Sequence, residues 1–372
     1  MTSVSANGSS PPTRPAVVLL NFGGPRNLEE VPGFLFEILR DPNTIQLPFP
    51  QWAQDLLAGR IARRRSHEVT RQYAAIGGSS PIVPATLRIR NALADALREA
   101  GCPLPVYVAQ RYLPGDAEAT VQVLLADGVD AIFAVPLYPH FSYATSGSSF
   151  EQLADLLAAA GWEGRLDALR SYPDAPGLLE AMAERLEATL REKGLQPEGT
   201  VILCSAHGLP RVYVDQGDPY RLELYRTMEG LRLRFPQWRF DLSFQSRVGP
   251  AEWLKPYTDQ YVPQLAAEGV RDLVFVPISF VNDHIETNYE VGVTYFELAR
   301  AHGLTPHRAL AVEDHPAHIR VLADAAAQWA AGRAGVPLTE LLPSDQHFAR
   351  VGRWAWGLWL VALFAALLFA LT

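Results

Sequence analysis

Two short stretches decide the fold, VVLLNFGGP at residues 17–25 and VILCSAHGLP at residues 201–210. Each is an apolar run rich in β-branched residues, and each ends in small or polar residues and a proline. Such runs are typical of parallel strands that are covered on both faces. Because one stretch lies in each half of the chain, they predict that the second half repeats the first.

The same order of elements follows both stretches. In each half, a Gln and an Arg are followed by a loop and a helix that end in Gly-Val, and then by a strand that ends in Val-Pro. The residues are Gln110-Arg111 in the first half and Gln245 with Arg247 in the second. Apolar runs and amphipathic segments alternate along the rest of the chain. We therefore expect strands at 16–22, 106–110, 131–137, 200–205, 240–244 and 273–278, and helices at 86–100, 117–127, 150–160, 177–193 and 218–234.

This alternation predicts an α/β fold class with two similar doubly wound (Rossmann-like) parallel-sheet domains that face each other across a cleft. Residues 16–178 would form the N-terminal domain and residues 179–335 the C-terminal one, whose last helix can pack back on the first domain. Residues 1–15 are rich in Ser and Pro and have no apolar signal region, so they predict a disordered tail. Residues 336–353 would be a linker.

The C-terminal segment is apolar throughout. Residues 354–371 carry no charge, and at 1.5 Å per residue they make roughly 27 Å of helix, close to the ~30 Å hydrocarbon thickness of a bilayer. Trp354, Trp356 and Trp359 gather at one end, next to Arg353, where interfacial residues belong. We expect a transmembrane anchor that holds the two α/β domains on the cytoplasmic face of the cell membrane. The alternatives are a buried helix or one lying flat on the membrane, although the segment has no polar face.

Composition excludes several classes of protein. The chain has 372 residues, of which 48% are hydrophobic, so it can bury a large core and is not intrinsically disordered. Its net charge of −8 disfavours nucleic-acid binding. Cys102 and Cys204 cannot supply a four-cysteine zinc or iron–sulfur site, and they fit a reducing compartment. The dinucleotide and P-loop glycine patterns are absent, and Ser205 with His207 lacks the hydrolase elbow.

A row of carboxylates follows the last predicted strand. Asp283, Glu286, Glu290 and Glu297 lie at spacings of three, four and seven, which would place them on one stripe of a helix roughly 20 Å long. On spacing alone, a solvated helix face explains this row as well. Because ligands of doubly wound sheets bind beyond the carboxyl ends of the strands, and because His284 lies beside the row, a functional role is also open. Such carboxylates repel one another, raise one another's pKa and attract divalent cations or protons.

His207 also follows a predicted buried strand. Gly208 and Pro210 favour a tight turn that presents its side chain, although a histidine at a strand end can be structural or catalytic. His315 and His318 have the spacing of a metal-binding pair, but no carboxylate row accompanies them. We expect these two to lie on the surface.

Eight motifs occur in a fixed order along residues 16–330. They are LNFGGP (20–25), YAAIGGSSPI (73–82), QRY (110–112), YPHFS with TSGSS (138–149), LCSAHGLP (203–210), QGDPY (216–220), QSRVGPAEWLKP (245–256) and VPISFVNDHIETNYE (276–290). Together they resemble the ferrochelatase family of metal chelatases (lyases), which insert Fe²⁺ into a porphyrin. The resemblance implies two doubly wound domains with the porphyrin between them. It also implies an enzyme of heme biosynthesis that converts protoporphyrin IX to protoheme in the terminal step.

The resemblance also implies roles for individual residues. His207 and Glu286, on opposite sides of the macrocycle, would be the catalytic and metal-binding pair, and Asp283 and Glu290 would lie on a path for protons or metal. The substrate-binding residues would be Phe22, Arg64, Arg65, Tyr73, Ser80, Arg111, Tyr112, Trp253, Phe280 and His284. The arginines among them suit the porphyrin propionates. Thr294 stands where the acidic row of the family usually continues with a carboxylate.

Cofactors and partners follow from the same resemblance. Fe²⁺ would be a substrate, and neither a dissociable cofactor nor an iron–sulfur cluster is expected. The C-terminal helix and an apolar lip over the cleft would contact the membrane, and the preceding enzyme of the porphyrin pathway is a further expected partner. The residues that match the lip are Phe34, Leu35, Ile38, Leu39 and Leu47. Three other interpretations stay open: a coproporphyrin ferrochelatase, a catalytically silent, membrane-bound tetrapyrrole-binding protein, and a generic α/β ligand-binding protein.

Overall fold

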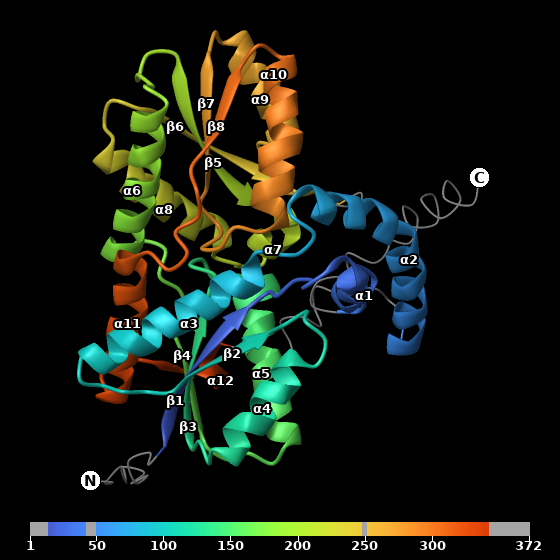
Figure 1. Ribbon diagram of the computed structural model, residues 1–372, viewed down its shortest axis with the longest axis vertical. Helices are drawn as coiled ribbons and strands as arrows, with labels where there is room; N and C mark the ends of the chain where they lie inside the picture. The colour runs from blue at the N-terminus through green and yellow to red at the C-terminus, as the bar shows by residue number, and fades with distance from the viewer. Residues whose placement is uncertain (1–13, 42–49, 248–250, 342–372) are drawn as a thin grey trace.

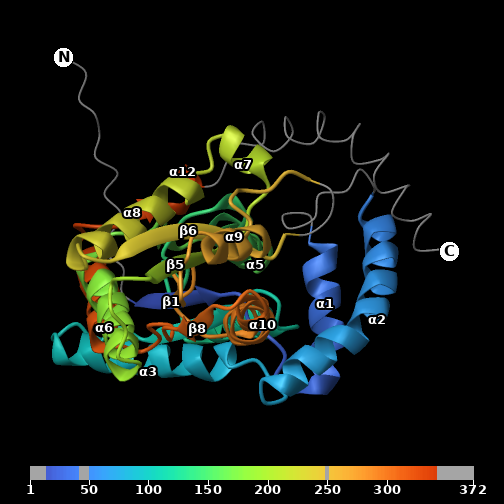
Figure 2. The same ribbon diagram turned by 90° about the horizontal axis from the view of Figure 1, so that it is seen from above.

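The computed structural model describes residues 14–41, 50–247 and 251–341. Within them, two parallel sheets covered by helices lie one above the other, and a pair of helices stands to one side (Figures 1 and 2). The anchor predicted at 354–371 lies outside the described residues, as do Leu47 and residues 1–13 of the predicted tail. No helix in the described part of the chain is long and apolar enough to cross a membrane.

The first sheet has the order β2-β1-β3-β4-β9, in which all neighbours are parallel except β9, which pairs antiparallel with β4. Its strands are β1 (Pro15–Asn21), β2 (Val106–Gln110), β3 (Ala131–Pro136), β4 (Arg165–Ala168) and β9 (Val336–Pro337). The helices that connect them are α3 (Ile82–Glu99), α4 (Asp116–Ala126) and α5 (Ser148–Ala159), and a short π-helix, η2 (Tyr143–Gly147), precedes α5.

The second sheet repeats this arrangement with the order β6-β5-β7-β8, and all its pairs are parallel. Its strands are β5 (Thr200–His207), β6 (Arg239–Gln245), β7 (Asp272–Pro277) and β8 (Thr305–Arg308). The helices are α6 (Pro176–Glu192), α7 (Arg211–Asp215), α8 (Tyr220–Arg234), α9 (Thr258–Ala267) and α10 (Phe296–Ala301), and a longer π-helix, η3 (Glu286–Tyr295), precedes α10.

Strand register gives the equivalence between the halves residue by residue. In the first sheet Leu20 on β1 pairs with Pro136, the last residue of β3. In the second sheet Ser205 on β5 pairs with Pro277, the last residue of β7. Two residues further on, at the carboxyl end of the central strand, lie Phe22 and His207. The predicted internal repeat is therefore present, and these two side chains occupy equivalent places.

The predicted α/β fold with parallel sheets is confirmed. Each of the six predicted strands and five predicted helices is found, with ends that shift by four residues at most. The strands that sequence patterning missed, β4, β8 and β9, are only two to four residues long and lie at or next to the sheet edges, and β4 and β8 carry polar residues. They lack the apolar run by which the central strands were found.

Two helices that were not predicted form an arm beside the sheets. The 3-10 turn η1 (Leu28–Glu30) leads into α1 (Val31–Arg40), which packs against the long helix α2 (Gln51–Ala75). Both figures show α1 and α2 together at the side of the molecule. The buried face of α2 carries small residues such as Ala58 and Ala62, which let the two helices approach closely. Its composition is otherwise polar, and so it has no strong apolar periodicity.

The last described segment returns to the first half. α11 (Pro316–Ala330) packs against α3 and α6, and the Trp329 ring stacks on Phe133 at 5.2 Å between centroids. Residues 336–341, placed in the predicted linker, form β9 and α12 (Leu338–Leu341).

The prediction of a surface position for His318 is wrong, because its side chain is fully buried and its Nδ1 donates to the Glu313 carbonyl at 2.7 Å.

The two halves are held together by a shared core and by buried carboxylates. The largest apolar cluster contains residues of both sheets and of α6 and α11. Glu223 on α8 accepts from the backbone N–H of Phe141 at 2.7 Å, and Asp218, just before α8, accepts from that of Tyr143 at 2.9 Å. The loop after β3 is thus anchored by the second half, which limits movement of one sheet relative to the other.

Candidate active site

His207 is the last residue of β5, and its hydrogen bonds define its tautomer. Nδ1 lies 2.7 Å from the carbonyl oxygen of Gly208. Because a carbonyl can only accept, Nδ1 carries the proton in the neutral ring, and Nε2 keeps a free lone pair. The backbone around the ring is also fixed, since Tyr220 Oη donates to the His207 carbonyl at 3.0 Å and Ser279 Oγ accepts from its N–H at 3.2 Å. The ring therefore presents a base or metal ligand.

Trp253, predicted as a substrate-binding residue, stands beside this histidine, with its ring centroid 6.4 Å from that of His207. The approach depends on Gly208, since a Cβ there would lie 2.9 Å from the Trp253 ring and 2.9 Å from the Gln245 carbonyl oxygen. A glycine at this position is thus a packing requirement.

Glu286 is the first residue of η3 and forms an ion pair with His284, in which Nε2 and Oε2 are 2.8 Å apart. Burial by itself would raise the pKa of Glu286, but the His284 charge outweighs it and lowers this pKa to about 2. Burial likewise would lower the pKa of His284, and the negative charge of Glu286 raises it instead. Both ring nitrogens face acceptors, because Nδ1 lies 3.1 Å from the Asn282 carbonyl. The pair is therefore an imidazolium beside a carboxylate.

This overturns one expectation. Acidic neighbours were predicted to raise the pKa of Glu286, whereas the adjacent imidazolium lowers it. Phe280, also predicted at the site, packs edge-to-face on the His284 ring at 4.2 Å and holds that ring in place.

Glu290 lies one turn further along η3 and is enclosed by donors. Its carboxylate accepts from the Ser246 N–H at 2.9 Å, from the Ser246 hydroxyl, from Gln245 Nε2 at 3.2 Å and from Tyr295 Oη at 3.1 Å. Burial nevertheless raises the pKa of Glu290. Ser246 has a φ of +64°, a conformation that costs energy for any residue with a Cβ. The backbone is thus held in an unfavourable conformation where it binds this carboxylate.

The predicted stripe of four carboxylates is not formed. The helix is a π-helix that begins only at Glu286, so Asp283 lies before it and pairs with Arg308 on β8 instead. Glu297 falls in α10 and is exposed. The sequence spacing assumed an α-helix, and the wider turn of the π-helix changes which residues share a face. Glu286 and Glu290 alone remain together beside His207.

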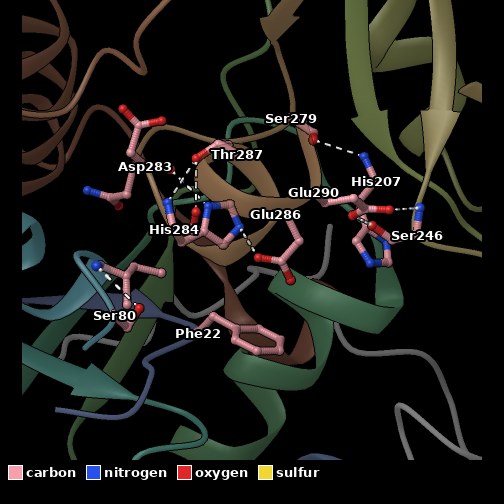
Figure 3. A network of polar contacts seen from close by, with 12 residues as sticks. Phe22, Ser80, His207, Ser246, Ser279, Asp283, His284, Glu286, Thr287 and Glu290 are labelled. Carbon is pink, nitrogen blue, oxygen red and sulfur yellow. Dashed lines mark hydrogen bonds and ion pairs between the residues drawn. The ribbon is translucent and has the colours of Figure 1, made fainter. Parts of the chain in front are cut away.

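Figure 3 shows the arrangement of these groups, with the Glu286 carboxylate between the His284 ring and the pair formed by His207 and Glu290. His207 lies close enough to interact with both glutamates, since a positive charge on its ring would act to lower the pKa of each. The side chain of Glu286 is 24% exposed, although its Oε2 is buried beside the His284 ring. The structure therefore brings a free imidazole nitrogen, at the end of β5, and an ionised carboxylate, at the start of η3 after β7, to one partly exposed region of the second half.

Aromatic side chains from the first half and from the helical arm lie beside Glu286. Phe22 packs on Tyr112 at 4.5 Å and on Phe34 at 6.2 Å, and Phe34 contacts Tyr73 at 6.4 Å. The charge of Glu286 raises the pKa of Tyr73, as burial does, which shows that this tyrosine is close to the site. Ser80 is buried behind them, and its N–H donates to the Pro25 carbonyl at 2.7 Å. These predicted residues form an apolar wall.

The predicted arginines take two different positions. Arg111 is buried and already engaged, since it pairs with Asp41 at 2.7 Å and also donates to the Ser148 carbonyl. Arg64 and Arg65 are exposed on α2. Of the predicted lip residues, Phe34 points inward, while Leu35, Ile38 and Leu39 are partly exposed.

Sequence reasoning missed a contact that joins the halves at the site. The Asn21 side-chain amide, at the end of β1, donates to Thr86 Oγ1 at 2.7 Å and to Asn282 Oδ1 at 3.0 Å. Asn282 in turn positions His284. Asn21 and Gln245 were visible as polar residues at strand ends, but nothing local in the sequence shows which distant group each one meets.

Comparison with known proteins gives a family match. A family model described as Ferrochelatase matches residues 14–329.

The chain belongs to the ferrochelatase family.

Curated relatives extend the match over nearly the whole chain. A ferrochelatase of Synechocystis is 40% identical over 93% of this chain and 90% of its own length. A ferrochelatase of Nostoc is 41% identical over 84% of this chain and 81% of its own length. Among solved structures, SirB from Bacillus subtilis with Fe³⁺ has a TM-score of 0.51 at 12% identity and is matched over 96% of its length, with 86% of this chain covered. That likeness shows a shared fold.

Proposed function

We propose that this protein is a ferrochelatase that inserts Fe²⁺ into protoporphyrin IX and releases two protons to form protoheme. The observation that carries the proposal is the pairing of His207, with its free Nε2, and ionised Glu286 at one accessible site of a ferrochelatase-family chain. Metal insertion needs a base for the two pyrrole N–H protons and an anion for the dication. A neutral imidazole suits the first task near pH 7, and a permanently ionised carboxylate suits the second.

Each residue of the site has a distinct part in this proposal. His207 Nε2 accepts a pyrrole proton. Glu286, kept ionised by His284, draws Fe²⁺ toward the macrocycle, and its charge favours the positive charge that develops on His207. Glu290, whose pKa burial raises, is the better proton acceptor of the two carboxylates and takes the proton onward. Asp283 fixes the loop through Arg308.

The surroundings favour protoporphyrin over coproporphyrin. The wall of Phe22, Tyr73 and Tyr112 is apolar, and Arg111 is already neutralised by Asp41. Arg64 and Arg65 on α2 would meet the two propionates of protoporphyrin, whereas coproporphyrin brings four. Binding energy gained along the wall can also be used to bend the ring, which exposes its nitrogen lone pairs.

The decisive experiment is anaerobic insertion of Fe²⁺ into protoporphyrin IX and coproporphyrin III, measured side by side on the purified full chain. We expect turnover with protoporphyrin. Faster turnover with coproporphyrin would assign the other chelatase activity, and tight porphyrin binding without turnover would identify a silent tetrapyrrole-binding protein.

We further propose a location on the cytoplasmic face of the cell membrane, anchored by residues 354–371 and assisted by the partly exposed lip residues. The uncharged run of about 27 Å supports this anchor. Tethering would raise the local concentration of a hydrophobic porphyrin and bring the site near the enzyme that supplies it. Deleting residues 354–372 should release the protein from membranes with activity largely intact. An inactive truncation would show that the segment belongs to the folded core.

No resident cofactor is proposed. Two cysteines cannot hold an iron–sulfur cluster, and Fe²⁺ enters as a substrate. Iron and acid-labile sulfide measured on the purified protein test this, and stoichiometric sulfide would contradict it.

A further inference from the structure

The solvent face of α2 carries a straight stripe of residues that the proposed chemistry does not use. The members follow each other at intervals of three or four, so they lie one above another on a single side of the helix. They are Trp52, Leu56, Arg60, Arg63, His67 and Arg71, and all are exposed. Trp52 is 71% and Leu56 53% exposed, which is unusual for side chains of this size on a soluble surface. We call this set the α2 stripe.

The stripe is strongly basic in an acidic protein. The chain has a net charge of −8, yet three arginines follow one another along this line and the stripe contains no acidic residue. Within the described residues, no carboxylate lies in ion-pair range of Arg60, Arg63 or Arg71, in contrast with Arg226, Arg239 and Arg247 elsewhere on the surface. A row of arginines that no described carboxylate neutralises favours binding of an extended anionic partner.

Within the described residues, the stripe faces away from the elements that pack on α2. The opposite side of the helix, with Ala58, Ala62 and Val69, is buried against the rest of the protein, and α1 covers it. Figures 1 and 2 show α2 at the margin of the molecule, set off from both sheets. The stripe spans about 28 Å at 1.5 Å per residue and is straight, which suits a flat partner better than a concave one.

We propose that the α2 stripe is a docking surface for anionic lipid headgroups. Trp52 and Leu56 enter the interfacial region at one end, and Arg60, Arg63 and Arg71 pair with lipid phosphates along the rest. A membrane interface has an apolar layer next to a layer of anionic headgroups. A tryptophan and a leucine in line with arginines match these two layers. This contact is distinct from the predicted anchor and lip, and it does not rest on the proposed iron chemistry.

The test places a nitroxide label on the stripe of the full chain and measures its depth by power-saturation EPR. The label is attached through His67→Cys in a Cys102→Ser background, because His67 lies between the arginines and contributes least to the charge; Cys204 is fully buried. The protein is reconstituted in vesicles of phosphatidylcholine alone or mixed with phosphatidylglycerol. A second label at Leu233→Cys on α8, a site that is 73% exposed, serves as the reference.

We expect the stripe label to reach headgroup depth only in the anionic vesicles, while the Leu233→Cys label stays in water. Raising salt to about 1 M, where the screening length is about 3 Å, should return the stripe label to water. The triple variant Arg60→Glu, Arg63→Glu, Arg71→Glu should do the same, since each arginine near an anionic surface is worth about a fivefold change in binding. The matched triple Arg98→Glu, Arg221→Glu, Arg300→Glu has the same charge change elsewhere and should leave the label immersed.

Two outcomes would overturn the proposal. In one, the stripe label stays in water on anionic vesicles. In the other, it enters neutral and anionic vesicles equally and the first triple variant has no effect. Iron insertion in detergent should be equal in both triple variants, so a loss of activity there would point to misfolding or to a failure of the proposed function, and not to the docking surface.

Discussion

The two halves of the molecule share one architecture and differ in the chemistry at the same place. At the end of the central strand the first half has Phe22, packed on Tyr112 at 4.5 Å, and the second half has His207, with a free Nε2. After the third strand each half forms a π-helix. In the first half η2 (Tyr143–Gly147) carries hydroxyl and small residues, and in the second η3 (Glu286–Tyr295) carries two glutamates.

This difference teaches that the repeat supplies geometry and that only the second copy supplies a histidine and carboxylates at these places. The strand-end position and the π-helix bring side chains to the same edge of each sheet. In the first half these places are filled by the apolar wall, and in the second by a base and two carboxylates. A flat apolar ligand with reactive central nitrogens needs both kinds of surface.

The largest expected effect is the loss of the base. His207→Ala should lower kcat for Fe²⁺ insertion by about 10²–10⁴-fold while porphyrin still binds, because the proton acceptor is gone and the apolar wall is intact. The measurement is anaerobic metal insertion together with porphyrin binding by tryptophan fluorescence quenching. Phe22→Ala, at the equivalent place in the other half, is the matched control and should weaken porphyrin binding more than it lowers kcat. Substantial turnover by His207→Ala would remove the role assigned to this residue.

Neutralising Glu286 should have the next largest effect. Glu286→Gln keeps the shape of the side chain and removes its charge, so kcat should fall about 10²-fold and the pKa of His284 should drop. NMR titration of the His284 ring checks this, and an unchanged titration would show that the two groups do not interact.

The same ion pair makes a signed prediction for stability. The pKa of Glu286 is lowered from 4.5 to about 2, so its contribution is complete above pH 4.5 and is lost as the pH falls through 2. The pKa of His284 is raised from 6.5, so its contribution is complete below pH 6.5 and is lost as the pH rises through the folded-state value. Urea unfolding should therefore show the greatest deficit of Glu286→Gln between pH 4.5 and 6.5. A deficit that grows above that range would contradict the pair.

Asp283 should matter for stability more than for turnover. Asp283→Ala leaves Arg308 without its partner in a mostly buried place and should cost about 3 kcal/mol of unfolding free energy. Asp283→Asn keeps an acceptor for the guanidinium and should recover part of this. Chemical denaturation gives the free energies. If Asp283→Asn were as inactive as His207→Ala while remaining folded, a direct part in proton or metal transfer would follow instead.

The smallest effect is expected at Ser246. Ser246→Ala and Ser246→Gly both remove the hydroxyl that Glu290 accepts from, so the pKa of Glu290 should rise further and turnover should fall by less than about tenfold. The two variants differ in backbone strain at position 246. An alanine has a Cβ and is destabilised by the positive φ there, whereas a glycine is not. Ser246→Gly should therefore be the more stable by about 1 kcal/mol. Equal stability of the two would show that the left-handed conformation is not strained here.

Much of the fold was predictable because its signals are local. An apolar run bounded by small residues indicates a buried parallel strand wherever it occurs, which is why the central strands of both sheets and the strand-end position of His207 followed from the sequence. The edge strand β8 and the strand β4, second from the edge, did not, since four residues of mixed polarity have no such pattern and become strands by pairing with a neighbour. α2 was missed for a related reason, because it buries small residues against α1.

The amino-acid sequence by itself determined the doubled α/β plan, the residue types at the strand ends and the family resemblance, all of which are written in short stretches of chain. The tertiary structure decided which charges meet. It joined Glu286 to His284, diverted Asp283 to Arg308, and brought Asn21 to Asn282 across the halves. The physical reason is that electrostatic energy depends on distance in space, and a π-helix, a left-handed serine and a contact between halves each change those distances without any periodic signal in the sequence.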